Sequence, residues 1–344
     1  MIGWLYQKIF IAIVYDGSAY DVRVVTQKQK KLINKQSKHY EGDSALNDTL
    51  SFVRKQTEES PLHYVALLNP SPHQGALAEC FSRENNYLLN GSKTVCRNNK
   101  WTLYTSERKL EELQKEFAPV GLDFIFSPFS IIERFFADKI TGGLALYALA
   151  LKDSFSIGFF EEGKLEFAHH YPMHQNSVSM IVEEGGNPAG FSLGVEEEEE
   201  RDKGISLDDI ESLDDLDIID ELDDLSDIED LDALEEIVEF SDDAPTSIEK
   251  HASAPHADEV KGELDRFNDD YARFELIEKT LSDFYAGEQC KNRFVETVYI
   301  ADAYGSGTDL KRYLEEELFL NVLIRRIDIV DEVISLTIDE EEGL

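Results

Sequence analysis

The sequence is poor in cysteine, in long apolar runs and in basic residues, and each shortage excludes a class of protein. Three cysteines without a Cys-x-x-Cys pair exclude a disulfide-stapled or zinc-ribbon scaffold and predict reduced thiols in a reducing compartment. No apolar run approaches the roughly 20 residues that span a bilayer. Because the amino-terminal stretch lacks a basic region followed by an apolar core, we expect no signal peptide and an intracellular protein.

The shortage of basic residues is the most restrictive of the three. Only 33 Lys and Arg stand against 71 Asp and Glu, so the formal net charge is −38. Phosphate binding needs clustered cations, and we therefore exclude nucleic acid as a partner. The hydrophobic content of 42% is that of a folded protein, and 344 residues suffice for two domains.

Apolar and alternating segments predict an α/β fold in which one order of elements occurs twice. Each half reads as three meandering strands, a helix, a strand, a helix and a strand. In the first half we expect strands at 10–15, 21–26, 35–40, 62–68, 101–104 and 122–126, and helices at 45–55, 106–117 and 128–136. In the second half we expect strands at 144–151, 154–160, 164–169, 294–300 and 321–324, and helices at 263–285 and 308–318, before a mixed tail. The duplication predicts a first lobe at 1–140 and a second at 141–192 and 262–344.

An acidic stretch at 193–261 interrupts the second half. Between 195 and 243 there are 25 acidic and 2 basic residues, and Leu or Ile recurs at every third position from Leu207 to Ile237. Three helical residues turn about 300°, so this stripe winds round a helix and forms no single apolar face. The stretch therefore predicts a disordered, low-complexity insertion. A tether that recognises a basic partner and a carboxylate metal site remain the alternatives.

Three turns at predicted strand ends resemble the nucleotide-binding turns of the actin-like ATPase superfamily. They are the two phosphate hairpins, within 11–18 and 149–158, and the adenosine loop, within 298–318. The residues that would face a nucleotide are Asp16, Gly17, Ser18, Asp153, Ser154, Asp302, Gly305 and Gly307. The sequence from the second hairpin to 172 is most similar to PilM, the cytoplasmic component of type IV pilus assembly platforms, and next to the cytoplasmic domain of GspL-type proteins. The resemblance covers 1–190 and 262–330 and implies a duplicated ribonuclease-H-like, actin-like fold.

The same turns depart from the superfamily pattern. Such hairpins work because Asp carboxylates position Mg²⁺ and glycine amides approach phosphate closely. Here Asp16 directly precedes Gly17, bulky Phe155 follows the second turn, and Tyr304 stands where paired glycines are usual. The P-loop lysine and its spacing are absent. The sequence therefore indicates a degenerate nucleotide site without a cofactor, with ATP and Mg²⁺ as the alternative.

The other polar clusters are typical of structural positions. His169 and His170 are adjacent on a predicted strand and so face opposite sides, which argues against a shared metal site. Ser127 before Pro128 reads as a helix start rather than a nucleophile. The sequence therefore names no catalytic and no metal-binding residue.

The resemblance implies a cytoplasmic, non-catalytic scaffold at the inner face of the inner membrane. Its partner would be the N-terminal cytoplasmic segment of a single-span, PilN-like protein, bound in a groove drawn from residues 26–120. The machine would be a pilus or competence apparatus, a type II secretion system or a flagellar-motor accessory, and the scaffold could form a homo-oligomer or ring. The alternatives are an actin-like ATPase that binds Mg-ATP between its lobes, and an acidic adaptor that recognises a basic partner through 195–243.

Overall fold

The computed structural model describes residues 7–80, 89–173, 257–287, 293–305 and 307–343. The insertion predicted at 193–261 therefore lies outside the described residues, except for its last positions, which begin helix α4 (Ala257–Ala286). Within the described ranges, none of the helices combines the length and the apolar character that crossing a bilayer requires.

The first five-stranded sheet is built around β1 (Lys8–Tyr15), in which every residue from Ile9 to Val14 is buried. An apolar run of this kind is typical of a central strand that is covered on both faces. Its other strands are β2 (Ala19–Lys28), β3 (Lys31–Glu41), β4 (Leu62–Leu68) and β8 (Phe124–Phe126). Their order is β3-β2-β1-β4-β8, with β2 antiparallel to both neighbours and the last two strands parallel to β1.

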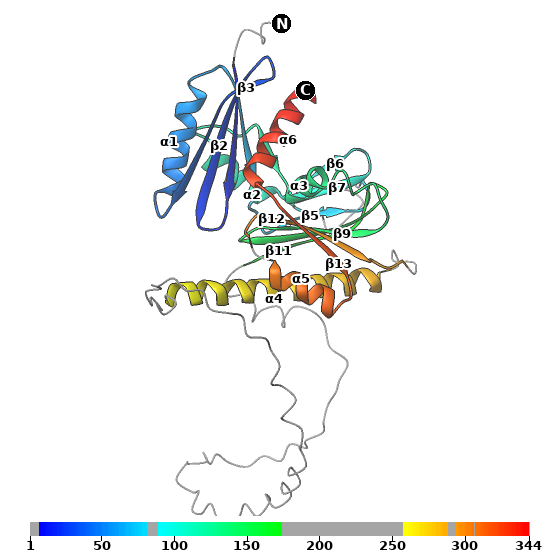
Figure 1. Cartoon of the computed structure of the whole chain (residues 1–344). Coiled ribbons are helices and arrows are strands. Elements are labelled where there is room, and N and C mark those ends of the chain that lie inside the picture. The colour runs from blue at the N-terminus through cyan, green and yellow to red at the C-terminus, as the bar shows by residue number, and fades with distance from the viewer. Residues whose placement is uncertain (1–6, 81–88, 174–256, 288–292, 306, 344) are drawn as a thin grey trace, which may run out of the picture. The chain divides into compact units, whose positions relative to one another are not determined.

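The second five-stranded sheet repeats this topology around β9 (Ala145–Ala150), a strand that is buried along its whole length. Its other strands are β10 (Ser154–Glu161), β11 (Lys164–Pro172), β12 (Thr297–Asp302) and β13 (Asn321–Arg326). Their order is β11-β10-β9-β12-β13, again with three antiparallel strands followed by two parallel ones. Because both sheets share one ribonuclease-H-like topology, the predicted duplicated, actin-like fold is confirmed (Figure 1).

Helices cover the outer faces of both sheets and fill the space between them. Helix α1 (Ala45–Thr57) contacts the first sheet, and α4 and α5 (Thr308–Glu316) lie side by side against the second sheet. Between the sheets lie α3 (Pro128–Phe135) and α6 (Ile329–Gly343), which contact one another. The buried core around them draws on both sheets, for example through Phe10, Ala12, Phe129, Phe136, Tyr147, Leu149, Val333 and Ile334. The two lobes therefore share one core.

A third, small sheet is inserted into the first lobe between β4 and β8. It consists of β5 (Gln74–Leu77), β7 (Trp101–Ser106) and β6 (Ser92–Arg97), in that order, and is followed by α2 (Glu107–Glu116). Ser106 caps α2 as predicted, by accepting a hydrogen bond from the Lys109 backbone. The strands β5 and β6 were not predicted, because β5 has only four residues and β6 is largely exposed and carries little apolar alternation.

The structure joins Cys80 and Cys96 in a disulfide, with 5.4 Å between their Cα atoms. The prediction of reduced thiols is therefore wrong for these two residues. Cys96 lies on β6 and pairs with Thr102 of β7, and β7 also pairs with β5, whose end leads to Cys80. Strand pairing thus brings together two cysteines that are 16 positions apart. Cys290 lies outside the described residues.

Helix α6 takes the place of the mixed tail that the sequence analysis expected. Its Ile, Val and Thr content disfavours a helix locally, but the burial of Val333, Leu336 and Thr337 stabilises it. Ion pairs add to this contact, among them Lys8–Glu341 and Arg134–Glu332. Although α6 follows the last strand of the second sheet, it packs mainly on the first sheet. The boundaries 1–140, 141–192 and 262–344 remain proposals.

We predict that Leu336→Ala destabilises the whole protein. The side chain is buried in the core between the sheets, and its truncation should lower the free energy of unfolding by about 2–5 kcal/mol. The matched control is Glu342→Ala, which removes only an exposed ion pair to Lys30 and should change stability by less than about 1 kcal/mol. Urea unfolding followed by circular dichroism compares the two variants. Equally small effects would contradict the packing of α6.

Candidate functional site

The turn between β1 and β2 is closed by its own aspartate. Asp16 Oδ1 accepts hydrogen bonds from the backbone N–H groups of Ser18 (2.9 Å) and Ala19 (2.6 Å), and from Ser18 Oγ (3.0 Å). Burial raises the pKa of Asp16, but these hydrogen bonds and the Lys152 cation outweigh burial and leave the pKa below its ordinary value. The Asp16 carboxylate therefore stabilises the turn through these hydrogen bonds.

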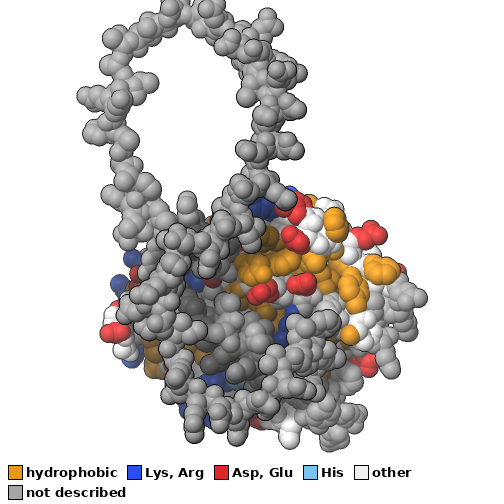
Figure 2. Space-filling model, turned by 90° about the horizontal axis from the view of Figure 1, so that it is seen from below, with side chains coloured by type: hydrophobic (Ala, Val, Ile, Leu, Met, Phe, Trp, Pro, Cys, Tyr) orange, Lys and Arg blue, Asp and Glu red, His pale blue; other side chains and the backbone are white. Residues whose placement is uncertain are grey.

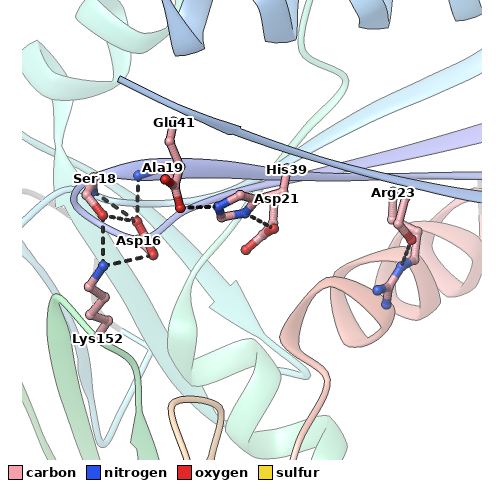
Figure 3. Close-up of polar contacts among 9 residues, drawn as sticks. Asp16, Ser18, Ala19, Asp21, Arg23, His39, Glu41 and Lys152 are labelled. Atoms are coloured by element: carbon pink, nitrogen blue, oxygen red, sulfur yellow. Dashed lines mark hydrogen bonds and ion pairs between the residues drawn. The ribbon is translucent and has the colours of Figure 1, made fainter. Parts of the chain in front are cut away.

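Lys152 extends from the turn between β9 and β10 to this first turn (Figure 3). Its Nζ donates to Ser18 Oγ at 2.8 Å and lies 3.3 Å from Asp16 Oδ2. The next residue, Asp153, packs so closely on Gly17 that a Cβ on that glycine would lie 3.1 Å from the Asp153 Cβ. Gly17 also has a φ of +88°, which favours glycine. The two hairpin turns thus touch, and a lysine bridges them; we call this contact the clasp.

The third turn follows β12 and is likewise closed by its aspartate. Asp302 is buried, and its Oδ1 accepts hydrogen bonds from the backbone N–H groups of Tyr304 (3.0 Å) and Gly305 (2.8 Å). The turn adjoins the second hairpin, because Ala303 N donates to Ala150 O at 3.1 Å. The structure therefore brings the third turn to the end of β9, next to the clasp.

A carboxylate from α4 occupies the N-terminus of α5. Asp270 Oδ2 accepts hydrogen bonds from the backbone N–H groups of Gly307 (3.0 Å) and Leu310 (3.3 Å). Such N–H groups form an anion site, and here the anion is supplied by the chain itself. Asp270 Oδ1 is 3.5 Å from Arg273 Nη1.

The fully buried Arg273 links this helix terminus to the rest of the site. Its Nη2 donates to Leu151 O at 3.1 Å, and its guanidinium lies 5.6 Å from the centre of the Tyr304 ring. A planar guanidinium suits both contacts, because it donates in its plane and stacks on aromatic faces. Arg273 therefore fixes the third turn against the second hairpin.

The residues present do not fit a magnesium nucleotide. Binding one requires carboxylates that can turn to the metal and backbone amides that can turn to phosphate. Asp16 and Asp302 accept hydrogen bonds within their own turns, and the amides at the start of α5 bind Asp270. Ser154 Oγ donates to Asp153 Oδ1 at 3.3 Å. The polar groups of the three turns are thus engaged with one another.

His39 on β3 forms a second polar cluster near the clasp (Figure 3). Its Nε2 lies 2.6 Å from Glu41 Oε1, and its Nδ1 lies 2.7 Å from Asp21 Oδ1 of β2. The contact with Glu41, followed by the contact with Asp21, raises the pKa of His39 to about 9. The imidazolium therefore ties the edge strand β3 to β2 at neutral pH.

A pocket of about 300 Å³ lies between the first sheet and the start of α6. Arg23 of β2 lies in its wall, with Nη1 at 2.7 Å from Asp328 Oδ1 and 2.8 Å from Asp331 Oδ1. Burial lowers the pKa of Arg23, but the two carboxylates outweigh it, so the guanidinium stays charged. The pocket thus contains an ion-pair link from the first sheet to α6.

The three turns were predicted from the sequence, but the side chains that pair with them were not. Lys152, Asp270 and Arg273 were not among the predicted site residues. The only local signal for the last two was an interruption of the apolar face of α4 by charged residues. His170 is buried and hydrogen-bonded to Ser156 while His169 is exposed, so the prediction that they face opposite sides is confirmed.

Two family models match the chain. One is described as "Domain of unknown function (DUF8341)" and matches residues 146–342, which is more than half of the chain. The other is described as "Domain of unknown function (DUF8569)" and matches residues 6–133. No curated protein matches the chain. The two models divide the chain close to the predicted border between its lobes.

Several solved structures are similar to the chain at low sequence identity. A Bacteroides thetaiotaomicron protein "with actin-like ATPase fold and unknown function" is 10% identical, with 96% of this chain and 95% of that chain covered and a TM-score of 0.48. A "PilM-PilN type IV pilus biogenesis complex" is 10% identical, with 96% of this chain and 97% of that chain covered and a TM-score of 0.46. The structure of MreB 5 of Spiroplasma citri bound to AMPPNP is 11% identical, with 98% of this chain and 99% of that chain covered and a TM-score of 0.39. The fold assignment rests on the two repeated sheets and not on these structural similarities.

We predict a loss of stability at alkaline pH that depends on His39. Because its pKa is about 9 in the folded protein against 6.5 ordinarily, the protonated ring stabilises the fold fully below pH 6.5. This contribution is lost as the pH rises through 9. Unfolding midpoints measured across this range should fall more for the wild type than for His39→Gln.

The titration of the ring gives a direct check of the same prediction. In an NMR titration the His39 resonances should shift with a midpoint near pH 9, and Asp21→Asn should lower that midpoint by removing one carboxylate. A midpoint near 6.5 in the wild type would contradict the paired geometry.

Proposed function

The chain belongs to the DUF8341 family, and we propose that it is a non-catalytic, actin-like scaffold. It docks the N-terminal cytoplasmic segment of a single-span, PilN-like protein at the inner face of the inner membrane. The observation that carries the proposal is the clasp, in which Lys152 bridges the two hairpin turns where an actin-like ATPase would hold phosphate.

The clasp supports a scaffold because it removes the need for a ligand between the lobes. Each group that would grip a nucleotide already has a partner in the chain: Lys152 for Asp16 and Ser18, and Asp270 for the start of α5. A nucleotide would have to replace these hydrogen bonds and leave the buried Arg273 without its carboxylate, which is costly. The lobes therefore keep one arrangement, and a fixed arrangement suits a docking surface.

The choice of partner rests on the resemblance of the turn sequences to PilM and on the fold. One similar structure is a complex of PilM with PilN. We place the docking groove within residues 26–120, which include the small sheet β5-β7-β6, whose strand β5 lies against β11 of the second sheet. An extended segment can bind there by adding to a strand edge or by inserting apolar side chains. The machine is a pilus or competence apparatus, a type II secretion system or a flagellar-motor accessory.

We predict that millimolar Mg-ATP does not raise the melting temperature of the protein. A ligand at 100 times its Kd would stabilise the fold by about 2.7 kcal/mol, a shift that differential scanning fluorimetry detects. Lys152→Ala should melt earlier and still show no shift, because Asp270 and Asp302 keep their own hydrogen bonds. A magnesium-dependent rise in the wild type would overturn the proposal in favour of the ATPase alternative.

We predict that the folded lobes, and not the acidic insertion, retain the partner. An immobilised peptide with the sequence of the cytoplasmic N-terminus of a PilN-like protein should capture both the full chain and a variant lacking 195–260. A scrambled peptide of the same composition is the control, because it keeps the net charge of the peptide and changes the order of its residues. Capture that is lost with the insertion would identify the acidic adaptor instead, and equal capture by the scrambled peptide would contradict specific docking.

A further inference from the structure

In the part of the chain that the structure describes, β13 is the last strand of the second sheet and one of its edges is unpaired. Asn321 N donates to Glu296 O and Ile327 N to Asp302 O, so the odd-numbered residues of β13 bond to β12. The backbone groups of Val322 and Ile324 therefore face away from the sheet. Among the described residues, no hydrogen bond from another element reaches them. An edge of this kind is a template for a further strand.

This edge lacks the protection that the β3 edge of the first sheet carries. Along β3, Lys31, Lys35 and Lys38 place charges at the edge, which opposes pairing with another chain. The centre of β13 reads Val-Leu-Ile, and Leu323 is 44% exposed. An edge strand with an apolar centre that is in part accessible to solvent favours association.

Large exposed aromatic side chains lie at the start of the same edge. Phe319, just before β13, is 88% exposed, and Phe294, just before β12, is 74% exposed. Thr297 pairs with Asn321, so both rings precede their strands at the same end of the sheet. The neighbouring face, which carries α4 and α5, also shows hydrophobic side chains gathered among acidic ones (Figure 2). Exposed apolar side chains that gather on one surface and are rimmed by polar residues are typical of interaction surfaces.

The charges at the two ends of β13 favour a second copy of the same strand as the partner. Glu316 and Glu317 at the end of α5 precede β13, whereas Arg325 and Arg326 end it. Arg325 pairs with Asp138 of its own chain, while the Arg326 side chain is 77% exposed and lies 3.8 Å from Asp302. A second copy of the same strand laid antiparallel brings its acidic end opposite the basic end of the first, and a parallel copy would oppose like charges. The edge is thus complementary to itself only in the antiparallel arrangement, which is the arrangement that a two-fold axis produces.

We propose that β13 pairs with β13 of a second copy of this chain about a two-fold axis, which joins the second sheets of two copies into one continuous sheet. Phe319, Phe294 and Leu323 pack across the axis beside the strand pair. This surface is distinct from the docking groove proposed at 26–120. Evidence against the homodimer would therefore leave the proposed scaffold function unaffected, and the reverse also holds.

Sedimentation velocity across a range of protein concentrations tests the proposal. One strand pair with a few large side chains forms a small interface, of the class below about 1,200 Å² that gives weak association, so the range should reach hundreds of micromolar. The wild type should dimerise reversibly, and Leu323→Lys should raise the dimer Kd at least tenfold. The matched control is Leu32→Lys on β3, an equally apolar residue that is 61% exposed, which should leave the Kd unchanged. A wild type that stays monomeric throughout would overturn the proposal.

A charge exchange tests the antiparallel arrangement. Arg326→Glu should weaken the dimer, and adding Glu317→Arg should restore it. The strand separates its own ends by about 17 Å, so this rescue must occur between two copies. Melting temperatures of the variants show that each one folds. A dimer that is insensitive to Leu323→Lys, or a double variant that is no tighter than Arg326→Glu alone, would contradict pairing through β13.

Discussion

The fold depends on two strands that must be covered on both faces. β1 and β9 are apolar along almost their entire lengths, and neither can leave a face in water. The outer helices α1, α4 and α5 cover one face of each sheet. The other faces meet in a common core with α3 and α6, which explains why the last helix of the chain returns to the first sheet. The shared core is what turns two repeated units into one body.

The shared core also places the ends of β1, β9 and β12 close to one another. The polar groups of the turns at these ends therefore need hydrogen-bond partners. Buried polar groups are costly when unpaired, and in an ATPase the nucleotide supplies many of the partners. Here Lys152, Asp270 and Arg273 supply them. The same three turns that could have held a ligand have become internal supports. In the proposed scaffold, these internal partners hold the shape of the site without a ligand.

Charge limits how the remaining surface can be used. A net charge of −38 repels a second copy at long range, but salt at physiological ionic strength screens such repulsion beyond about 8 Å. Association then depends on local complementarity, and the β13 edge combines an acidic end, an apolar centre and a basic end. The lysine-rich edge of β3 has no such pattern. The edge strands β3 and β13 thus differ in character.

The sequence by itself determined the elements whose signal is local. The apolar runs of β1 and β9, the caps at Ser106 and Ser127, and the strands and helices other than β5, β6 and α6 could be read from neighbouring residues, because periodicity and capping act within a few positions. Only the tertiary structure decided the rest. Helix α6 forms against local propensity because the core buries it, Cys80 meets Cys96 through strand pairing, and Lys152 reaches Asp16 across 136 positions. Such contacts gain their energy from residues far apart in the chain, and no local pattern records which distant groups will meet.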